Sequence, residues 1–246
     1  MKREFVKTSN AQLFEAKIKE AQQRGARESG LVALTGRPGE GKTRTLQAWA
    51  AEVGAVMVTA QVDWTPRKMI VEIAEKLGIE ITRGFERRME EMIVKGSISI
   101  IVDEAGFTLD NKAACLEKLR GITDKSSTLL VLVFMTHDIS RLFAANLKQL
   151  KDRINNECNF KKSTLEDVAL VCNQLSEVVI DPALIKHIFD KTDACMRLVV
   201  NAITRIEIAS RMRLDAQRSA PMTLADIKGV ELFHVLGQAS RKGSAA

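Results

Sequence analysis

The sequence predicts an α/β fold: a three-layer sandwich with a parallel five-stranded sheet, followed by a small α-helical subdomain. Three observations predict it. Short apolar runs alternate with helix-like segments up to Phe160, an alternation that is typical of parallel sheets. The first apolar run is followed by a glycine-rich segment and then by a helical pattern. After Phe160 only helical patterns follow.

The first four predicted strands are short apolar runs, and the fifth follows a helical stretch. The predicted strands are residues 31–35, 55–59, 98–102, 129–135 and 155–160. The helices expected around them are residues 10–24, 45–53, 65–77, 83–95, 110–120 and 140–150. The ends of the helix 65–77 are marked by Pro66 in its first turn and by Gly78 just past its last residue.

The helical subdomain is expected to begin with a capping box, Ser163-Thr164-Leu165-Glu166, which starts a helix that ends near Leu175. Asp181-Pro182 starts a second helix, and residues 195–213 and 223–238 are further expected helices.

The glycine-rich segment is the most specific motif in the chain. The eight residues from Gly36 to Thr43 fit G-x-x-x-x-G-K-[ST], the P-loop that holds nucleotide phosphates. Lys42 supplies a cation for the β- and γ-phosphates, and the Thr43 hydroxyl is a ligand for Mg²⁺. The alternative is a glycine-rich strand-to-helix turn without a ligand. The residues expected to bind nucleotide here are Gly36, Pro38, Gly39, Glu40, Gly41, Lys42, Thr43 and Arg44.

A pair of carboxylates follows the third predicted strand. Asp103 is expected to hold the Mg²⁺ together with Thr43, since an acid at the end of such a strand does so in P-loop proteins. Glu104 can orient and deprotonate an attacking water, which favours nucleotide hydrolysis over transfer to a substrate hydroxyl. The alternative is a solvated turn. No Asn-Lys-x-Asp motif is present, so ATP is favoured over GTP. The expected enzyme is therefore a Mg²⁺-dependent ATPase that forms ADP and phosphate.

Composition and charge restrict the class of protein. The chain has 46% hydrophobic and 28% charged residues, as is usual for a globular protein. Its longest apolar stretch, 129–135, is too short to span a bilayer, and residues 1–10 do not resemble a signal peptide. The four cysteines lie far apart in the sequence and are expected to be free thiols in a reducing cytoplasm. We expect a cytoplasmic protein of a bacterial cell, and a phage or a transposon is a further candidate source.

The net charge of +6 is unevenly distributed. Residues 1–30 carry +3 and residues 141–246 carry +4, whereas residues 31–140 carry −1. Basic ends favour a polyanionic partner such as DNA, although ordinary surfaces also carry such an excess. Because aromatic residues make up only 4% of the chain, contacts to backbone phosphates are a better expectation than base stacking.

A P-loop α/β core with a helical lid resembles the AAA+ ATPases. The resemblance implies a helical lead-in at 1–30, a nucleotide-binding core at 31–161, a lid at 162–240 and a disordered tail at 241–246. It also implies three further site residues. Each of them can also be interpreted as a residue without a role in the site. Thr136, or else His137, would sense the γ-phosphate, or Thr136 caps a helix. Arg153, or else Arg141, would act as a finger in the neighbouring subunit, and Arg197 would serve the nucleotide from the lid.

Within AAA+ the sequence is similar to the transposition regulators, the group of the phage Mu B protein and TnsC, with ExeA-like relatives. The similarity rests on the segment from Asp63 to Ile70, on Asp103-Glu104-Ala105 with the helix that follows, and on the segment from Met196 to Ala202. It implies a ring or helical filament on duplex DNA that recruits or stimulates a transposase. Only about 30 residues precede the first strand, so DNA contacts are expected from the core. The candidates are Arg67, Lys68, Lys112 and Lys118, each of which is equally interpretable as a solvated charge.

Other functions fit the same motifs. An AAA+ ATPase that acts on a protein client, such as a helicase loader or an ExeA-like ATPase, is the main alternative. A nucleotide switch without hydrolysis is a second one, and Asp103, Glu104 and Arg153 are arguments against it. A small-molecule kinase is the most distant, because we find no substrate pocket or lid arginines of that kind.

Overall fold

The structure is a computed structural model, and it describes all residues except 24, 26–29, 110–112, 143–153, 214–219 and 234–246. The chain divides into two compact units. Residues 9–161 form the first unit, and residues 1–8 together with 162–246 form the second. The N-terminal segment 1–30 is thus shared between them, and each unit is described below by itself.

The first unit contains a parallel sheet of five strands in the order β2-β3-β4-β1-β5. This confirms the predicted parallel five-stranded sheet. The strands are β1 (Leu31–Gly36), β2 (Val56–Thr59), β3 (Ile100–Asp103), β4 (Leu130–Met135) and β5 (Ile154–Asn159). All six residues of β1 are buried, since strands lie on both of its edges and helices cover both of its faces, as expected for a central strand of a parallel sheet.

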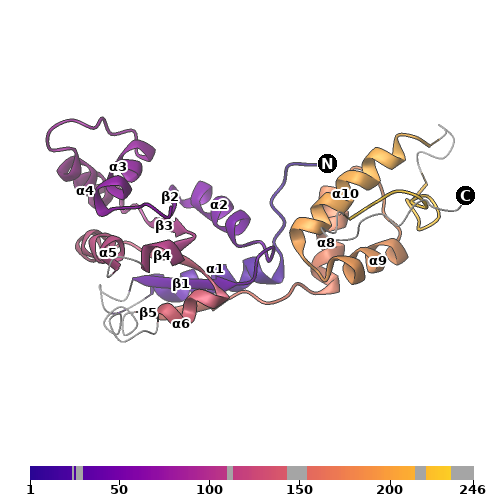
Figure 1. Ribbon diagram of the computed structural model, residues 1–246, viewed down its shortest axis with the longest axis horizontal. Helices are drawn as coiled ribbons and strands as arrows, with labels where there is room; N and C mark the ends of the chain where they lie inside the picture. Colours follow the sequence, from indigo (N-terminus) through magenta and orange to yellow (C-terminus); the bar gives the residue numbers. More distant parts are fainter. Residues whose placement is uncertain (24, 26–29, 110–112, 143–153, 214–219, 234–246) are drawn as a thin grey trace, which may run out of the picture. The chain divides into compact units, whose positions relative to one another are not determined.

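Helices cover both faces of the sheet and produce the predicted three layers (Figure 1). The helices of this unit are α1 (Ser9–Gln22), α2 (Lys42–Val53), α3 (Pro66–Lys76), α4 (Phe85–Gly96), α5 (Ala114–Ser126) and α6 (Ile139–Leu142). On one face α1 and α2 pack on the sheet, with the rings of Phe14 and Trp49 edge to face at 5.6 Å. On the other face α3, α4 and α5 bury Met69, Met89 and Leu116 completely. Among the described residues, both faces of the central strands are thus covered by helices, which leaves the strand ends as the surface on which a site can be built.

Local signals account for most helix ends. Thr65 caps α3 by accepting the N–H of Lys68, and Pro66 occupies the first turn as expected. The expected helix 110–120 does not have the predicted bounds. The observed helix α5 begins at Ala114 and continues to Ser126, and Ala105–Leu109 before it forms a 3-10 turn (η2). The strands β3 and β4 begin one or two residues later than predicted.

The second unit is a helical bundle of α8 (Leu165–Leu175), α9 (Pro182–Thr192) and α10 (Met196–Ser210). The three helices pack around a core that includes Val168, Leu184 and Val199. The first residues of the chain join this unit: Val6 is buried in its core, and the N–H of Lys2 donates to the carbonyl O of Leu175 at 2.8 Å.

Two sequence predictions in this unit need correction. The capping box of α8 consists of Thr164 and Asp167 and not of Ser163 and Glu166, since Thr164 is the residue with extended backbone before the helix. The expected helix 223–238 does not form over its described part. Asp226 instead accepts bonds from the Thr223 hydroxyl and N–H at 2.6 and 2.8 Å, which stabilises a turn.

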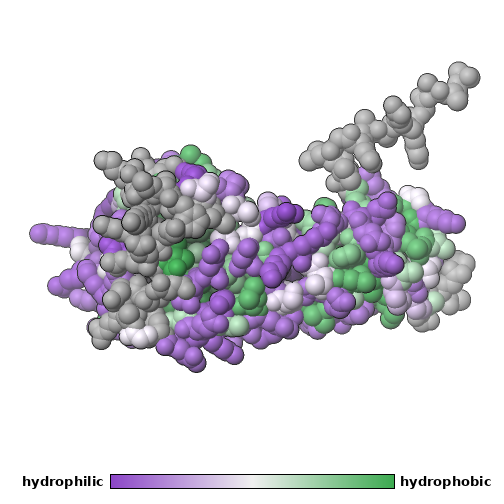
Figure 2. All heavy atoms as spheres, turned by 90° about the horizontal axis from the view of Figure 1, so that it is seen from below, coloured by the Kyte–Doolittle hydropathy of each residue, from purple (hydrophilic) through white to green (hydrophobic). Residues whose placement is uncertain are grey.

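Hydrophobic side chains are visible on the surface of the α8–α10 unit among hydrophilic ones (Figure 2). In the described part of this unit, the exposed large hydrophobic residues are Val179, Ile208, Met212 and Leu224. Within the ranges that the structure describes, no helix has the length and apolar character required to cross a membrane.

Candidate nucleotide site

The P-loop lies between the end of β1 and the start of α2, as its sequence predicts. Gly41 precedes α2 with a φ of 88°, a conformation that glycine adopts at little cost, and no side chain caps the helix. The P-loop thus leads directly into the N-terminus of α2, and a helix N-terminus attracts an anion through its N–H groups and its dipole. The loop closes tightly, because a Cβ on Gly36 would come within 2.6 Å of Glu40 Oε2 and 3.0 Å of Phe160 Cβ.

Lys42 and Glu40 shape the loop from within. Lys42 is 7% exposed, and its ammonium donates to the carbonyl oxygens of Gly36 and Arg37, both at 2.8 Å. Glu40 is also buried and accepts the N–H of Arg37 at 2.7 Å. The P-loop is therefore held in a curved conformation by its own residues. Of the other predicted contacts, Pro38 and Arg44 are exposed.

The structure brings Thr43 and Asp103 together. The Thr43 hydroxyl donates to Asp103 Oδ2 at 2.8 Å, which joins the first turn of α2 to the end of β3. Asp103 is buried, with 6% exposure, and its other oxygen accepts the N–H of Glu104 at 2.9 Å. A hydroxyl and a carboxylate are the hard oxygen ligands that Mg²⁺ prefers, so the two side chains fit the ion that the sequence analysis assigns to them.

Glu104 has an uncommon backbone conformation. Its φ is 54°, the left-handed region, which few residues with a side chain adopt. Its side chain is partly exposed, whereas those of Asp103 and Ala105 are buried. Because such strain is concentrated at functional sites, the conformation supports a role for the Glu104 carboxylate outside the core.

The end of β4 lies beside the P-loop. Met135 pairs with Gly36 in the sheet, and its sulfur lies 3.9 Å from Lys42 Nζ. Thr136 follows directly and is exposed, as is His137, so the position fits a sensor of bound nucleotide. The next residue, Asp138, is 5% exposed, and Arg141 donates to it at 3.3 Å. No motif in the sequence points to Asp138.

Three predicted site residues do not belong to the described part of the first unit. Arg153 and Lys112 lie outside the described residues. Arg197 is the second residue of α10 in the second unit, and it is exposed. Its role as a lid arginine stays a prediction.

Asn10 is a supporting residue that sequence reasoning missed. It is 4% exposed, and its amide exchanges two hydrogen bonds with the backbone of Lys161, at 2.7 and 3.0 Å. The same amide nitrogen lies 3.5 Å from the carbonyl O of Glu40 in the P-loop. A single asparagine thus links α1, the P-loop and the end of β5. No sequence signal identifies it, because its partners are backbone atoms more than 25 residues away.

The cysteines do not provide a second chemistry. All four thiols are free, as predicted, and three of them are buried. Burial raises the pKa of Cys158 and of Cys172 to about 12, so both thiols stay protonated near neutral pH. Within the described ranges, no group of three His, Cys, Asp or Glu side chains is arranged to hold a metal ion.

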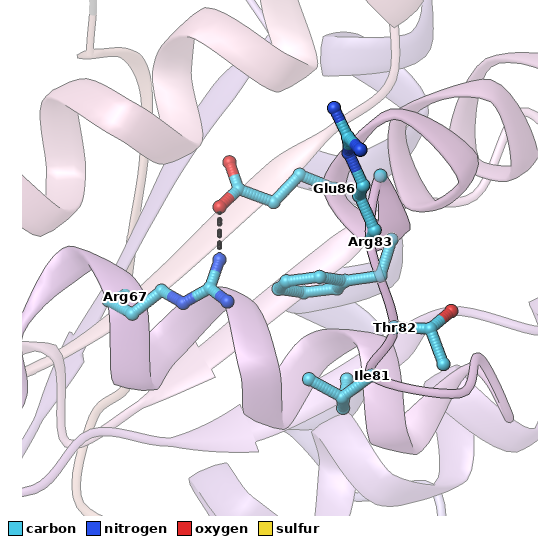
Figure 3. A pocket seen from close by; sticks show the side chains of 7 residues that line it. Arg67, Ile81, Thr82, Arg83 and Glu86 are labelled. Carbon is cyan, nitrogen blue, oxygen red and sulfur yellow. Dashed lines mark hydrogen bonds and ion pairs between the residues drawn. The ribbon is translucent and has the colours of Figure 1, made fainter.

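The predicted DNA contacts that the structure describes are paired with acids. Arg67 donates to Glu86 at 2.5 Å and stacks over the Phe85 ring at 4.5 Å (Figure 3). Lys68 pairs with Asp63, and Lys118 pairs with Glu86 at 3.4 Å.

Arg67 and Glu86 line an open pocket of about 370 Å³ at the start of α4, together with Ile81, Thr82, Arg83, Gly84 and Phe85. Among the described residues, Arg83 is an exposed guanidinium of this pocket without an acidic partner.

Comparison with known families gives a match within the first unit. Residues 24–143 are similar to a family described as an AAA domain. The matched stretch includes β1 to β4 and the P-loop, with Asp103 and Glu104 at the end of β3. A comparison with curated protein sequences gave no significant match.

Solved structures share the fold over most of the chain. Cdc6p from Pyrobaculum aerophilum matches with a TM-score of 0.60 and 16% identity, over 85% of this chain and 65% of that one. The ORC2 protein of Aeropyrum pernix, in ADPNP–ADP complexes, matches with a TM-score of 0.61 and 14% identity, over 89% and 64%. The ORC1 protein of Aeropyrum pernix, in complex with DNA, matches with a TM-score of 0.54 and 19% identity, over 87% and 63%.

These matches confirm the AAA P-loop NTPase fold and, at such low identities, only the fold. The chain spans slightly less than two thirds of the length of these structures. These matches therefore do not show what the whole protein acts on.

Proposed function

We propose that the protein is a Mg²⁺-dependent ATPase that assembles on duplex DNA and recruits or stimulates a transposase. The observation that carries the enzymatic part is the 2.8 Å hydrogen bond between Thr43 of the P-loop and Asp103 at the end of β3. It places the two oxygen ligands expected for Mg²⁺ side by side, with Glu104 as the next residue.

The residues divide the chemistry of hydrolysis between them. Lys42 and the N–H groups at the start of α2 bind the phosphates of ATP and offset their charge. Thr43 and Asp103 would hold the ion, which when bound supplies positive charge to the phosphate oxygens. Glu104 takes a proton from a water as the water oxygen bonds to the γ-phosphorus and ADP leaves. Thr136 senses the γ-phosphate, Arg153 acts in a neighbouring subunit, and Arg197 acts from the lid.

The DNA part of the proposal is supported by the sequence resemblance to transposition regulators and by the basic ends of the chain. The described surface adds one refinement. Because Arg67, Lys68 and Lys118 are neutralised by nearby acids, we propose Arg83 as a further contact to the DNA backbone. Arg67 and Lys68 are still 61% and 57% exposed and remain candidates, since a surface ion pair contributes little energy and exchanges easily.

Electron microscopy of negatively stained protein tests the assembly. We expect nucleotide-dependent filaments or stacked rings on duplex DNA with ATP or a non-hydrolysable analogue. Samples without nucleotide, and samples without DNA, are the controls. Discrete particles that are indifferent to DNA would contradict the proposal and favour a protein client.

The salt dependence of DNA binding tests the contact by Arg83. Affinity for duplex DNA should fall steeply with salt, and Arg83→Ala should reduce the slope of log K against log salt by about one unit. Arg87→Ala is the matched control, because Arg87 lies on α4 shortly after the turn that carries Arg83, is 84% exposed, and is paired with Glu91. Equal slopes for Arg83→Ala and the unmodified protein would exclude Arg83 as a contact. A flat salt dependence would exclude backbone binding altogether.

A protein client remains the second candidate function, and one observation favours it. The basic side chains on α3 and α5 that were expected to contact DNA are paired with acids, which leaves this surface mixed in charge. Such a surface is common in protein interfaces, and an adaptor without hydrolysis would share it. A phosphate-release assay with and without DNA separates these cases, because only the proposed function predicts hydrolysis that depends on DNA-bound assembly.

A further inference from the structure

Gly106 lies against the buried carboxylate of Asp138, although the two residues are far apart in the sequence. A Cβ on Gly106 would come within 2.3 Å of Asp138 Oδ2 and within 2.7 Å of Oδ1. No side chain fits at position 106 at such distances unless Asp138 moves. Asp138 has little freedom to move, since it is 5% exposed. The turn after β3 and the turn after β4 are therefore in direct contact.

Arg141 fastens this contact with hydrogen bonds. Its Nη1 donates to the carbonyl O of Gly106 at 3.2 Å and to Asp138 Oδ1 at 3.3 Å. The other carboxylate oxygen of Asp138 accepts the N–H of Met135 at 3.2 Å. One guanidinium and one carboxylate thus fix the Gly106 carbonyl relative to the end of β4, within a single chain.

The segment that is fixed in this way carries Glu104. The 3-10 turn η2 begins directly after Glu104, and Gly106 is its second residue. The N–H of Phe107 donates to the carbonyl O of Glu104 at 3.2 Å, which closes the turn on it. Glu104 has a left-handed backbone, and such a conformation persists only where its surroundings enforce it. Asp103 contributes one constraint through the Glu104 N–H, and the fixed η2 turn contributes the other.

We propose that Asp138 and Arg141 are positioning residues for Glu104. They hold the η2 turn and, through it, the left-handed backbone that keeps the Glu104 carboxylate where it can take a proton from the attacking water. Arg141 acts on the site of its own chain and not on that of a neighbour. This inference rests on the proposed ATP hydrolysis. It gives Asp138 and Arg141 a role toward the Glu104 carboxylate, and no direct contact with the nucleotide.

The kinetic test separates positioning from binding. Arg141→Ala should lower kcat for ATP hydrolysis by about 10- to 100-fold, the cost of a displaced catalytic group, while the Kd for ADP stays within about twofold of the original, because the P-loop is untouched. Arg141→Lys should recover most of kcat, since an ammonium can still donate to Gly106 and Asp138. Arg120→Ala is the matched control, because Arg120 also pairs with two acids, Glu117 and Asp124, but on α5.

Two further variants test the same proposal if Arg141→Ala is unstable. Gly106→Ala should mimic Arg141→Ala, because its Cβ displaces Asp138. In a Glu104→Gln background, Arg141→Ala should cause no further loss, since the group that it positions is already gone. An additive loss in the double variant, or an ADP affinity that falls together with kcat, would overturn the proposal.

Mixed assemblies distinguish action within one chain from action on a neighbour. Arg141→Ala protein mixed with Glu104→Gln protein should not regain hydrolysis, because no subunit has both residues intact. Recovery on mixing would mean that Arg141 reaches the adjacent subunit as a finger, which overturns the inference but keeps the ATPase proposal. Full activity of Glu104→Gln alone would instead remove the proposed role of Glu104. The two failures are thus distinguishable.

Discussion

Lys42→Ala should abolish nucleotide binding and, with it, assembly on DNA. Lys42 is the buried cation of the P-loop, and its ammonium now rests on two backbone carbonyls, from which it can turn to phosphate oxygens. Hydrogen bonds to charged groups contribute about 1.5–3 kcal/mol each, so losing two of them should weaken ATP binding by roughly 100-fold or more. Fluorescence titration with a labelled ATP analogue gives the Kd directly.

The control for this variant is Lys125→Ala, which removes an exposed lysine paired with Glu90 on the same unit. It should bind ATP normally. Circular dichroism checks that Lys42→Ala is folded. Normal ATP affinity in a folded Lys42→Ala protein would mean that the P-loop motif is a structural turn.

Glu104→Gln should bind ATP normally and hydrolyse it about 100- to 10,000-fold more slowly, the range for loss of a general base. Glutamine keeps the size of the side chain but cannot accept the proton. The backbone bond from the Glu104 N–H to Asp103 does not depend on the side chain, so Mg²⁺ and nucleotide affinity should be retained. Single-turnover measurements of phosphate release check the rate, and microscopy should show longer-lived filaments on DNA.

Glu117→Gln is the matched control for charge loss, because Glu117 is an exposed acid on α5 that pairs with Arg120. It should leave hydrolysis unchanged. A Glu104→Gln protein that turns over ATP at the original rate would assign the base to another residue. If filaments of Glu104→Gln protein dissociate as quickly as those of the unmodified protein, then ATP hydrolysis does not cause disassembly.

Residue patterns that act over short distances in the sequence were predicted well. The N-caps Thr65 and Asp181 lie where proline in the first turn and the following apolar residues indicate them. The segments of the P-loop motif and of the Asp103-Glu104 pair also lie where the sequence predicts, after β1 and at the end of β3, while their roles toward phosphate and metal stay predictions. The contact between Thr43 and Asp103 follows from placing both motifs on one parallel sheet.

Features that depend on tertiary contacts were not predictable in the same way. The contact of Gly106 with Asp138 and Arg141 joins two turns that only the order of β3 and β4 brings together. Asn10 acts through backbone atoms of distant segments. Residues 223–233 have the apolar spacing of a helix, yet the bonds from Thr223 to Asp226 favour a turn. The roles of Arg153, Lys112 and Arg197 stay predictions.

The chain enters the helical unit, leaves it for the α/β unit and then returns, and this path sets the order in which the units can fold during synthesis on the ribosome. Residues 1–8 pack with residues 162–246, so the α/β unit is an insertion within the helical one. Residues 1–8 are made before the α/β unit and must wait for α8 to α10 before Val6 can be buried, whereas the α/β unit can fold as soon as β5 has been made. Closing so long a loop is slow in a free chain. Once the α/β unit has folded, however, the bonds between Asn10 and Lys161 hold its two ends together. Completion of the helical unit then becomes a local event between neighbouring segments.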